Sequence, residues 1–161
     1  MNLSGSHTVA VPRERCWALL LDPVILAQCM PGCERLDLVG ENEYAMRMKM
    51  ILASVSGLFD GRVRIADPDP PSSYRLVVEG SGKIGFMRGD GLLTLTGTDT
   101  VTTVQFAGEV HVGGTIAGVG QRLIDATARL LIKRFFAKLA KVVAGAEGVE
   151  TEPEVSFGAG E

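Results

Sequence analysis

The sequence predicts an α+β fold in which a curved antiparallel sheet of about seven strands wraps around one long C-terminal helix. Three observations support this prediction. Segments that alternate apolar and polar side chains follow one another between residues 34 and 112 without an intervening helix, which is typical of an antiparallel meander. Two short helical segments come before this run, directly after a first strand. A helical period of about 28 residues follows it.

Length and composition indicate a single globular domain. The chain has 161 residues, of which 46% are hydrophobic, and a chain of this size can bury a substantial core. It has no uninterrupted apolar run of about 18 residues and no secretory signal at its start. The net charge of −3 argues against a general nucleic-acid binder. We therefore expect a soluble, cytoplasmic domain over residues 1–144 and an acidic, disordered tail over 145–161.

The first strand and the two short helices follow from local signals. Residues 8–11, Thr-Val-Ala-Val, predict the first strand. Pro12 suits the start of a helix over residues 13–21, because the amide hydrogen that proline lacks has no partner there. Asp22 followed by Pro23 predicts the N-cap and first residue of the second helix.

Six further strands are predicted at 35–39, 43–52, 58–66, 74–79, 86–96 and 101–112. The stretch at residues 67–71, Asp-Pro-Asp-Pro-Pro, is predicted to be a rigid turn that no central strand could contain. The long helix is predicted from about Ile116 to Val143. An amphipathic helix that lies across the apolar face of a curved sheet often leaves a cavity, so we expect a helix-grip architecture with a ligand site under the helix.

The expected cavity wall is apolar and rich in methionine. Met46, Met48 and Met50 alternate along one strand. Methionine is flexible and polarizable, so it suits a wall that adapts to a long apolar ligand, although ordinary core packing explains the same pattern. The predicted ligand-lining residues are Tyr44, Met46, Met48, Met50, Phe59, Val63, Phe86, Leu93, Phe106, Val110, Leu123, Thr127 and Leu130.

Charge is uneven along the C-terminal third of the chain. Residues 116–143 contain six basic side chains and one acidic side chain, whereas residues 145–161 contain five glutamates and no base. A solvated helix face explains this pattern, and so does docking on an anionic lipid surface. The residues expected to contact a membrane or a partner are Lys133, Phe135, Phe136, Lys138 and Lys141.

No catalytic, metal or nucleotide site is predicted. Cys29 and Cys33 have a C-x-x-x-C spacing that does not match zinc or redox motifs, so buried, reduced thiols are expected. Residues 80–85 match G-x-G-x-x-G, but a strand pattern follows where a phosphate site needs a helix. His7 and His111 are expected on the solvated face of the sheet, away from any pocket that could support acid–base catalysis.

Several segments resemble one protein family. Residues 22–33, DPVILAQCMPGC, are similar to the D-P-x-x-L-x-x-C-x-P-G-C motif of the family of G-type carbon monoxide dehydrogenase subunits, within the START-like (SRPBCC) superfamily. Residues 80–86, GSGKIGF, resemble its central hairpin. Gly113-Gly114, residues 118–123 and Phe135-Phe136 resemble its final helix. The similarity covers the whole predicted domain, and its first segment is the most specific.

The resemblance implies a helix-grip fold with an apolar cavity and a non-catalytic role beside a molybdenum-dependent hydroxylase of the carbon monoxide dehydrogenase type. It also implies recruitment of that enzyme to the inner face of the cell membrane. Many members continue into an apolar C-terminal anchor, which the last residues of this sequence do not resemble, so transient contact is expected. A quinone or lipid is the natural cargo, no covalent cofactor is required, and a homodimer is left open. The alternatives are a small START-like enzyme of the cyclase or hydrolase type and a pure docking adaptor.

Overall fold

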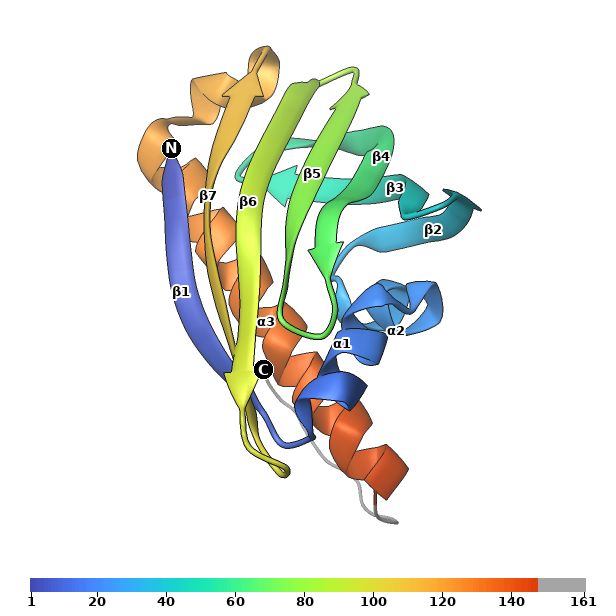
Figure 1. The fold of residues 1–161 in the computed structure, drawn as a ribbon. Coiled ribbons are helices and arrows are strands. Elements are labelled where there is room, and N and C mark those ends of the chain that lie inside the picture. The colour runs from blue at the N-terminus through green and yellow to red at the C-terminus, as the bar shows by residue number, and fades with distance from the viewer. Residues whose placement is uncertain (148–161) are drawn as a thin grey trace.

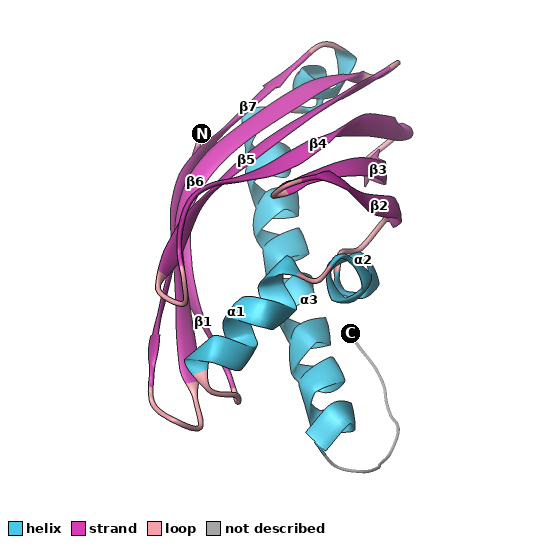
Figure 2. Ribbon diagram, turned by 45° about the vertical axis from the view of Figure 1, so that its right-hand side comes forward, coloured by secondary structure: helices cyan, strands magenta, loops and turns pink. Residues whose placement is uncertain are grey.

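The computed structural model describes residues 1–147, in which a curved sheet encloses a long helix (Figure 1). The elements in chain order are β1 (Asn2–Val9), α1 (Arg13–Leu21), α2 (Pro23–Cys29), β2 (Cys33–Gly40), β3 (Glu43–Leu52), β4 (Val55–Asp69), β5 (Ser73–Gly82), β6 (Gly85–Gly97), β7 (Thr102–Gly113), the 3-10 helix η1 (Thr115–Val119) and α3 (Gln121–Glu147). Figure 2 shows that the sheet bends toward α3 and that all three α-helices lie on the same side of it.

The strands form one antiparallel sheet in the order β1-β7-β6-β5-β4-β3-β2. From β2 to β7 each strand pairs with the next strand in the chain, as expected where the connections are too short for parallel crossovers. β1 pairs with β7, so β1 and β2 are the two edges of the sheet. The predicted helix-grip fold with seven strands is confirmed.

Two buried hydroxyl groups on the sheet hold the segment that contains α1 and α2. The hydroxyl of Tyr44 donates a hydrogen bond to the carbonyl of Leu21 at 2.6 Å, at the end of α1. The hydroxyl of Thr102 donates to the carbonyl of Val11 at 2.8 Å, just before α1 begins. Asp22 caps α2 as predicted, because its carboxylate accepts a hydrogen bond from an amide of the first turn at 2.9 Å.

The long helix begins later than the sequence pattern predicts. Thr115–Val119 form η1, and Gly120, with a φ of 104°, separates this turn from α3. A side chain is strained at such a φ, and glycine is not, so the helical pattern is interrupted there. α3 then continues to Glu147, past the expected start of the tail at residue 145. The remainder of the expected tail lies outside the described residues.

β4 extends further into the proline-rich segment than the sequence predicts. β4 continues through Pro68 to Asp69, and the pairing with β5 shifts register after Ala66. The shift takes the proline, which has no amide hydrogen, out of the regular hydrogen-bonded ladder. The turn is therefore confined to the residues that follow Asp69.

Candidate functional site

The strand register assigns the predicted cavity residues to a face of the sheet, because residues directly opposite each other in an antiparallel pair project to the same side. Tyr44 lies opposite Val63, and Met48 lies opposite Phe59. Phe59 packs in one cluster with Ile124 of α3, so this face is the concave one. The predicted residues on the concave face are Tyr44, Met46, Met48, Met50, Phe59, Val63, Leu93, Phe106 and Val110.

Phe86 does not belong to this set, and its predicted orientation is wrong. It lies opposite Gly113 on the convex face, where it is 48% exposed. Its neighbour Met87 occupies the concave face instead, opposite Gly80. The sequence held this signal, because Phe86 and Leu93 are an odd number of positions apart and cannot share a face of a regular strand.

Glycines on the concave face serve two different purposes. A Cβ added to Gly61 would lie 1.8 Å from the carbonyl oxygen of Glu79, so Gly61 lets neighbouring backbones approach where the sheet bends. A Cβ added to Gly89 would meet nothing closer than 3.7 Å. Gly89 therefore has room for a Cβ without a clash, and side chains around it on the concave face, such as Val78 and Val110, are only half-buried.

The buried side of α3 differs from the predicted stripe. Leu123 and Leu130 are 36% and 43% exposed, and Thr127 is half-buried. The helix buries a neighbouring line of residues that includes Ile124 and Leu139. The prediction placed the start of the helix before the break at residue 120, and this break rotates the helix relative to the expected pattern.

The two phenylalanines expected at a membrane surface belong to the core. Phe135 and Phe136 are only 8% and 9% exposed, and their rings pack edge to face at 5.2 Å. The predicted exposure of both rings is therefore wrong. Lys133, Lys138 and Lys141 are not buried with them. Within residues 1–147, no helix combines the length and apolar character needed to cross a membrane.

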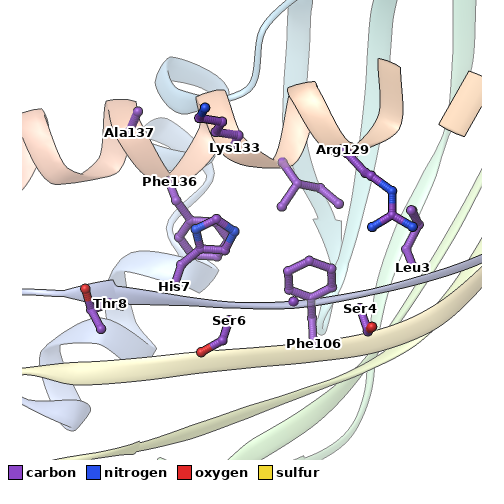
Figure 3. Close-up of a pocket in the computed structure, with 12 residues that line it drawn as sticks. Leu3, Ser4, Ser6, His7, Thr8, Phe106, Arg129, Lys133, Phe136 and Ala137 are labelled. Carbon is purple, nitrogen blue, oxygen red and sulfur yellow. The ribbon is translucent and has the colours of Figure 1, made fainter. Parts of the chain in front are cut away.

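A groove with a volume of about 540 Å³ runs between β1 and α3 (Figure 3). We call it the β1–α3 groove. Its apolar surface comes from Leu3 and Phe106 on the sheet and from Ile132 and Phe136 on the helix. The other residues that line it are Ser4, Gly5, Ser6, His7, Thr8, Arg129, Lys133 and Ala137. Of the predicted ligand-lining residues, Phe106 alone takes part in this groove.

His7 lies in the groove rather than on the solvated face, so its predicted position is wrong. Its ring stacks on Phe136, with centroids 4.3 Å apart, and is nearly parallel to Phe106 at 6.1 Å. Burial lowers the pKa of His7. The strand period in the sequence indicates this position. His7, Leu3 and Val9 all occupy odd-numbered positions of β1 and therefore share a face, and Leu3 and Val9 are buried.

The charged side chains of the sheet project to the convex face. The expected outward orientation of Asp60, Glu79 and Glu109 is confirmed, since all three are exposed. Asp60 forms an ion pair with Arg47 at 2.7 Å, and hydrogen bonding to this arginine lowers the pKa of Asp60. His111 lies 3.4 Å from Glu109 on the same face. Because these charged side chains lie on the convex face, the concave face is predominantly apolar.

The thiols and phenols in the interior have raised pKa values. Burial raises the pKa of Cys16 to about 11 and also raises that of Cys29, and all three cysteines are free. Burial likewise raises the pKa of Tyr44 and Tyr74, which lie on the concave side. These groups stay protonated near neutral pH. Among residues 1–147, no cluster of histidine, cysteine and carboxylate side chains could hold a metal ion.

A curved seven-stranded sheet around a long C-terminal helix, with two short helices after β1, defines a helix-grip protein of the START-like (SRPBCC) superfamily. Residues 5–144 match the model of the CoxG family, the G-type subunits of carbon monoxide dehydrogenase. The chain belongs to this family, as its sequence motifs implied. Membership suggests an accessory role in carbon monoxide dehydrogenase.

Solved structures agree with this assignment. A conserved protein from Geobacillus kaustophilus is 36% identical, with a TM-score of 0.85 over 91% of this chain and 97% of that chain. Protein CV1439 from Chromobacterium violaceum is 18% identical, with a TM-score of 0.64 over 88% and 96%. The Zhui aromatase/cyclase from Streptomyces sp. R1128 is 17% identical, with a TM-score of 0.62 over 92% and 99%, and this similarity concerns the fold alone. No curated protein sequence matches the chain significantly.

Proposed function

We propose that this protein is a non-catalytic accessory subunit of a molybdenum-dependent hydroxylase of the carbon monoxide dehydrogenase type. In this proposal it binds an apolar ligand, such as a quinone or a lipid, against the concave face of the sheet and helps couple the enzyme to the membrane. The observation that carries the proposal is the match of residues 5–144 to the CoxG family of carbon monoxide dehydrogenase.

The chemistry of the concave face supports binding rather than catalysis. Its central positions carry methionine, valine and glycine, and several of them are half-buried rather than sealed in the core. The titratable groups that reach this side include Tyr44 and Tyr74, whose raised pKa values keep them neutral. A neutral, adaptable wall favours a long apolar ligand over a charged substrate that needs acid–base chemistry.

The ligand can be tested with decylubiquinone as the probe and native mass spectrometry as the readout. Gly89→Leu should reduce the fraction of protein that retains the probe, because the new side chain would project from the concave face on which the ligand is proposed to bind. Gly89→Ala is the matched control, since a Cβ there meets nothing closer than 3.7 Å. Gly61 is unsuitable for this purpose, because even a Cβ would clash with backbone. Equal retention by both Gly89 variants would contradict binding at the concave face.

Enzyme coupling needs a separate experiment. The purified hydroxylase should co-purify with both Gly89 variants, whereas electron delivery to membrane quinone should fall only with Gly89→Leu. A pure docking adaptor predicts that neither measurement distinguishes the two variants. A START-like enzyme of the cyclase or hydrolase type predicts turnover of its own substrate without the hydroxylase.

A further inference from the structure

Within residues 1–147, three buried side chains carry a hydroxyl group: Tyr44, Tyr74 and Thr102. The hydroxyls of Tyr44 and Thr102 donate to backbone carbonyls at the two ends of α1. Tyr74 is only 3% exposed, yet its hydroxyl forms no hydrogen bond with any residue that the structure describes. Such a buried donor loses the hydrogen bonds that it makes in water, so an unpartnered one is rare and calls for an explanation.

The surroundings of the Tyr74 hydroxyl are apolar. The ring of Trp17 meets the ring of Tyr74 edge to face, with 5.3 Å between the centroids. The hydroxyl of Tyr44, in the same cluster, is already bonded to the carbonyl of Leu21. The thiol of Cys16 is near enough to affect the pKa of Tyr74, but a thiol is a weak hydrogen-bond partner. The other members of the cluster are Leu36, Val63, Ile65, Leu76 and Leu93. A buried water needs about three polar partners, so these surroundings suit a single water molecule poorly.

Tyr74 lies at the border of a half-buried part of the concave face. It is directly opposite Leu93 in the β5–β6 pair, and Leu76, the next residue of β5 on this face, is opposite Gly91. The half-buried residues in this part of the face are Val63, Leu76, Val78, Gly89, Gly91, Leu93 and Val110. A ligand that occupies this part of the face can therefore extend as far as Tyr74.

The protonation state of Tyr74 makes it a donor. Burial raises the pKa of Tyr74, so the phenol keeps its proton near neutral pH. An apolar ligand that reaches this group can satisfy it only by offering an acceptor atom. A carbonyl oxygen is such an acceptor and brings no charge into the apolar surroundings.

We propose that the hydroxyl of Tyr74 donates a hydrogen bond to a carbonyl oxygen of the ligand and so selects ligands that have a carbonyl over hydrocarbons of the same length. This inference rests on the proposed binding of an apolar ligand to the concave face. The head of the ligand lies beside Tyr74 and Trp17, and its tail follows the half-buried residues of the sheet. A quinone ring and the ester of a lipid both supply the required oxygen.

The stability of the ligand-free protein provides the first test. Tyr74→Phe keeps the ring beside Trp17 and removes only the hydroxyl, so urea should unfold this variant at the same or a higher concentration than the unmodified protein. Tyr44→Phe is the matched control, and it should unfold at a lower concentration because it loses the bond to Leu21. An equal loss in both variants would show that a buried water already satisfies Tyr74, which would overturn the proposal.

A pair of probes, titrated into the full-length protein and measured by native mass spectrometry, provides the second test. Tyr74→Phe should raise the dissociation constant of decylubiquinone about five- to tenfold, because one hydrogen bond is lost. Decylbenzene has the same tail and no carbonyl, and it should bind both proteins equally. The infrared carbonyl band of bound decylubiquinone should lie at lower frequency in the unmodified protein than in Tyr74→Phe. Equal effects of the substitution on the two probes would overturn the proposal.

Methyl laurate distinguishes the source of the carbonyl. If Tyr74→Phe weakens binding of this ester and not of decylubiquinone, the ligand is a lipid, and the reverse result assigns a quinone. Retention of decylubiquinone and methyl laurate by Tyr74→Phe as tightly as by the unmodified protein would overturn the role of Tyr74 and leave the proposed ligand function intact. Retention of no probe by the unmodified protein would overturn both.

Discussion

The imidazole ring of His7 lies on the ring of Phe136, with 4.3 Å between the centroids and 10° between the planes. His7 belongs to the edge strand β1 and Phe136 to α3, so this stack fastens the edge of the sheet to the long helix (Figure 3). Arg129 and Lys133 line the same groove from the helix side. Burial lowers the pKa of His7 and so favours the neutral imidazole in the folded protein.

This relationship predicts a specific pH dependence of stability. The pKa of folded His7 lies below the ordinary value of 6.5, so the unfolded chain binds a proton more readily. The free energy of unfolding should therefore fall as the pH drops through about 6.5 and become constant below the folded pKa. Urea titrations at a series of pH values should show a shallower fall for His7→Phe, which keeps an aromatic ring in the stack. An equally steep fall for His7→Phe and the unmodified protein would contradict the assignment of this pH dependence to His7.

The concave glycines predict opposite outcomes for one chemical change. Gly61→Ala should lower the free energy of unfolding by about 3 kcal/mol or more, because the new Cβ would lie 1.8 Å from the carbonyl oxygen of Glu79. Gly89→Ala should change it by less than about 1 kcal/mol, since its Cβ makes only ordinary contacts. Denaturant unfolding of both variants is the measurement. Similar losses at the two positions would contradict the different roles assigned to these glycines.

The rotation of α3 predicts which leucines stabilise the fold. Leu139 is completely buried, and Leu139→Ala should cost about 2–5 kcal/mol. Leu130 is 43% exposed, and Leu130→Ala should cost less than about 1 kcal/mol. Thermal or chemical denaturation distinguishes this orientation from the one that the sequence pattern predicts. A larger loss for Leu130→Ala than for Leu139→Ala would contradict the observed orientation.

Contact with a membrane, if part of the function, should depend on lysines and not on the buried phenylalanines. The double substitution Lys133→Gln/Lys138→Gln should weaken binding to phosphatidylglycerol vesicles about tenfold or more, because each lysine near an anionic surface contributes about 1 kcal/mol. Lys49→Gln/Lys83→Gln changes the net charge equally at exposed sites elsewhere and serves as the control in vesicle sedimentation. Equal loss in both variants would indicate a general charge effect without a defined contact face.

Local signals in the sequence were sufficient for much of the fold. Asp22 and Pro23 mark the start of α2, and the alternation through residues 43–52 gives β3 its observed bounds. The motif at residues 22–33 was sufficient for the family. Each of these depends on neighbouring residues in the chain, whose preferences can be read without knowing the tertiary structure.

The candidate site was predicted less well, for identifiable physical reasons. The strand period puts Phe86 and Leu93 on opposite faces of β6, so the prediction that both line one cavity gives Phe86 the wrong face. The break at Gly120 shifted the predicted stripe of α3, so Leu123 and Leu130 were assigned to the cavity and Phe136 to the surface. In a strand, an error of a single residue moves every later side chain to the other face. In a helix, a pattern extended across a break such as Gly120 no longer predicts which side of the next helix is buried.

By itself, the sequence determined the order of the elements, the antiparallel character of the sheet and the family. Only the tertiary structure decided that β1 and α3 lie side by side, that His7 and Phe136 meet between them, and that Arg129 and Lys133 of α3 line the same groove as β1. The reason is the separation of these segments along the chain. Contacts between them arise from the closure of β1 onto β7 and from the rotation of α3, and neither is encoded in a local pattern.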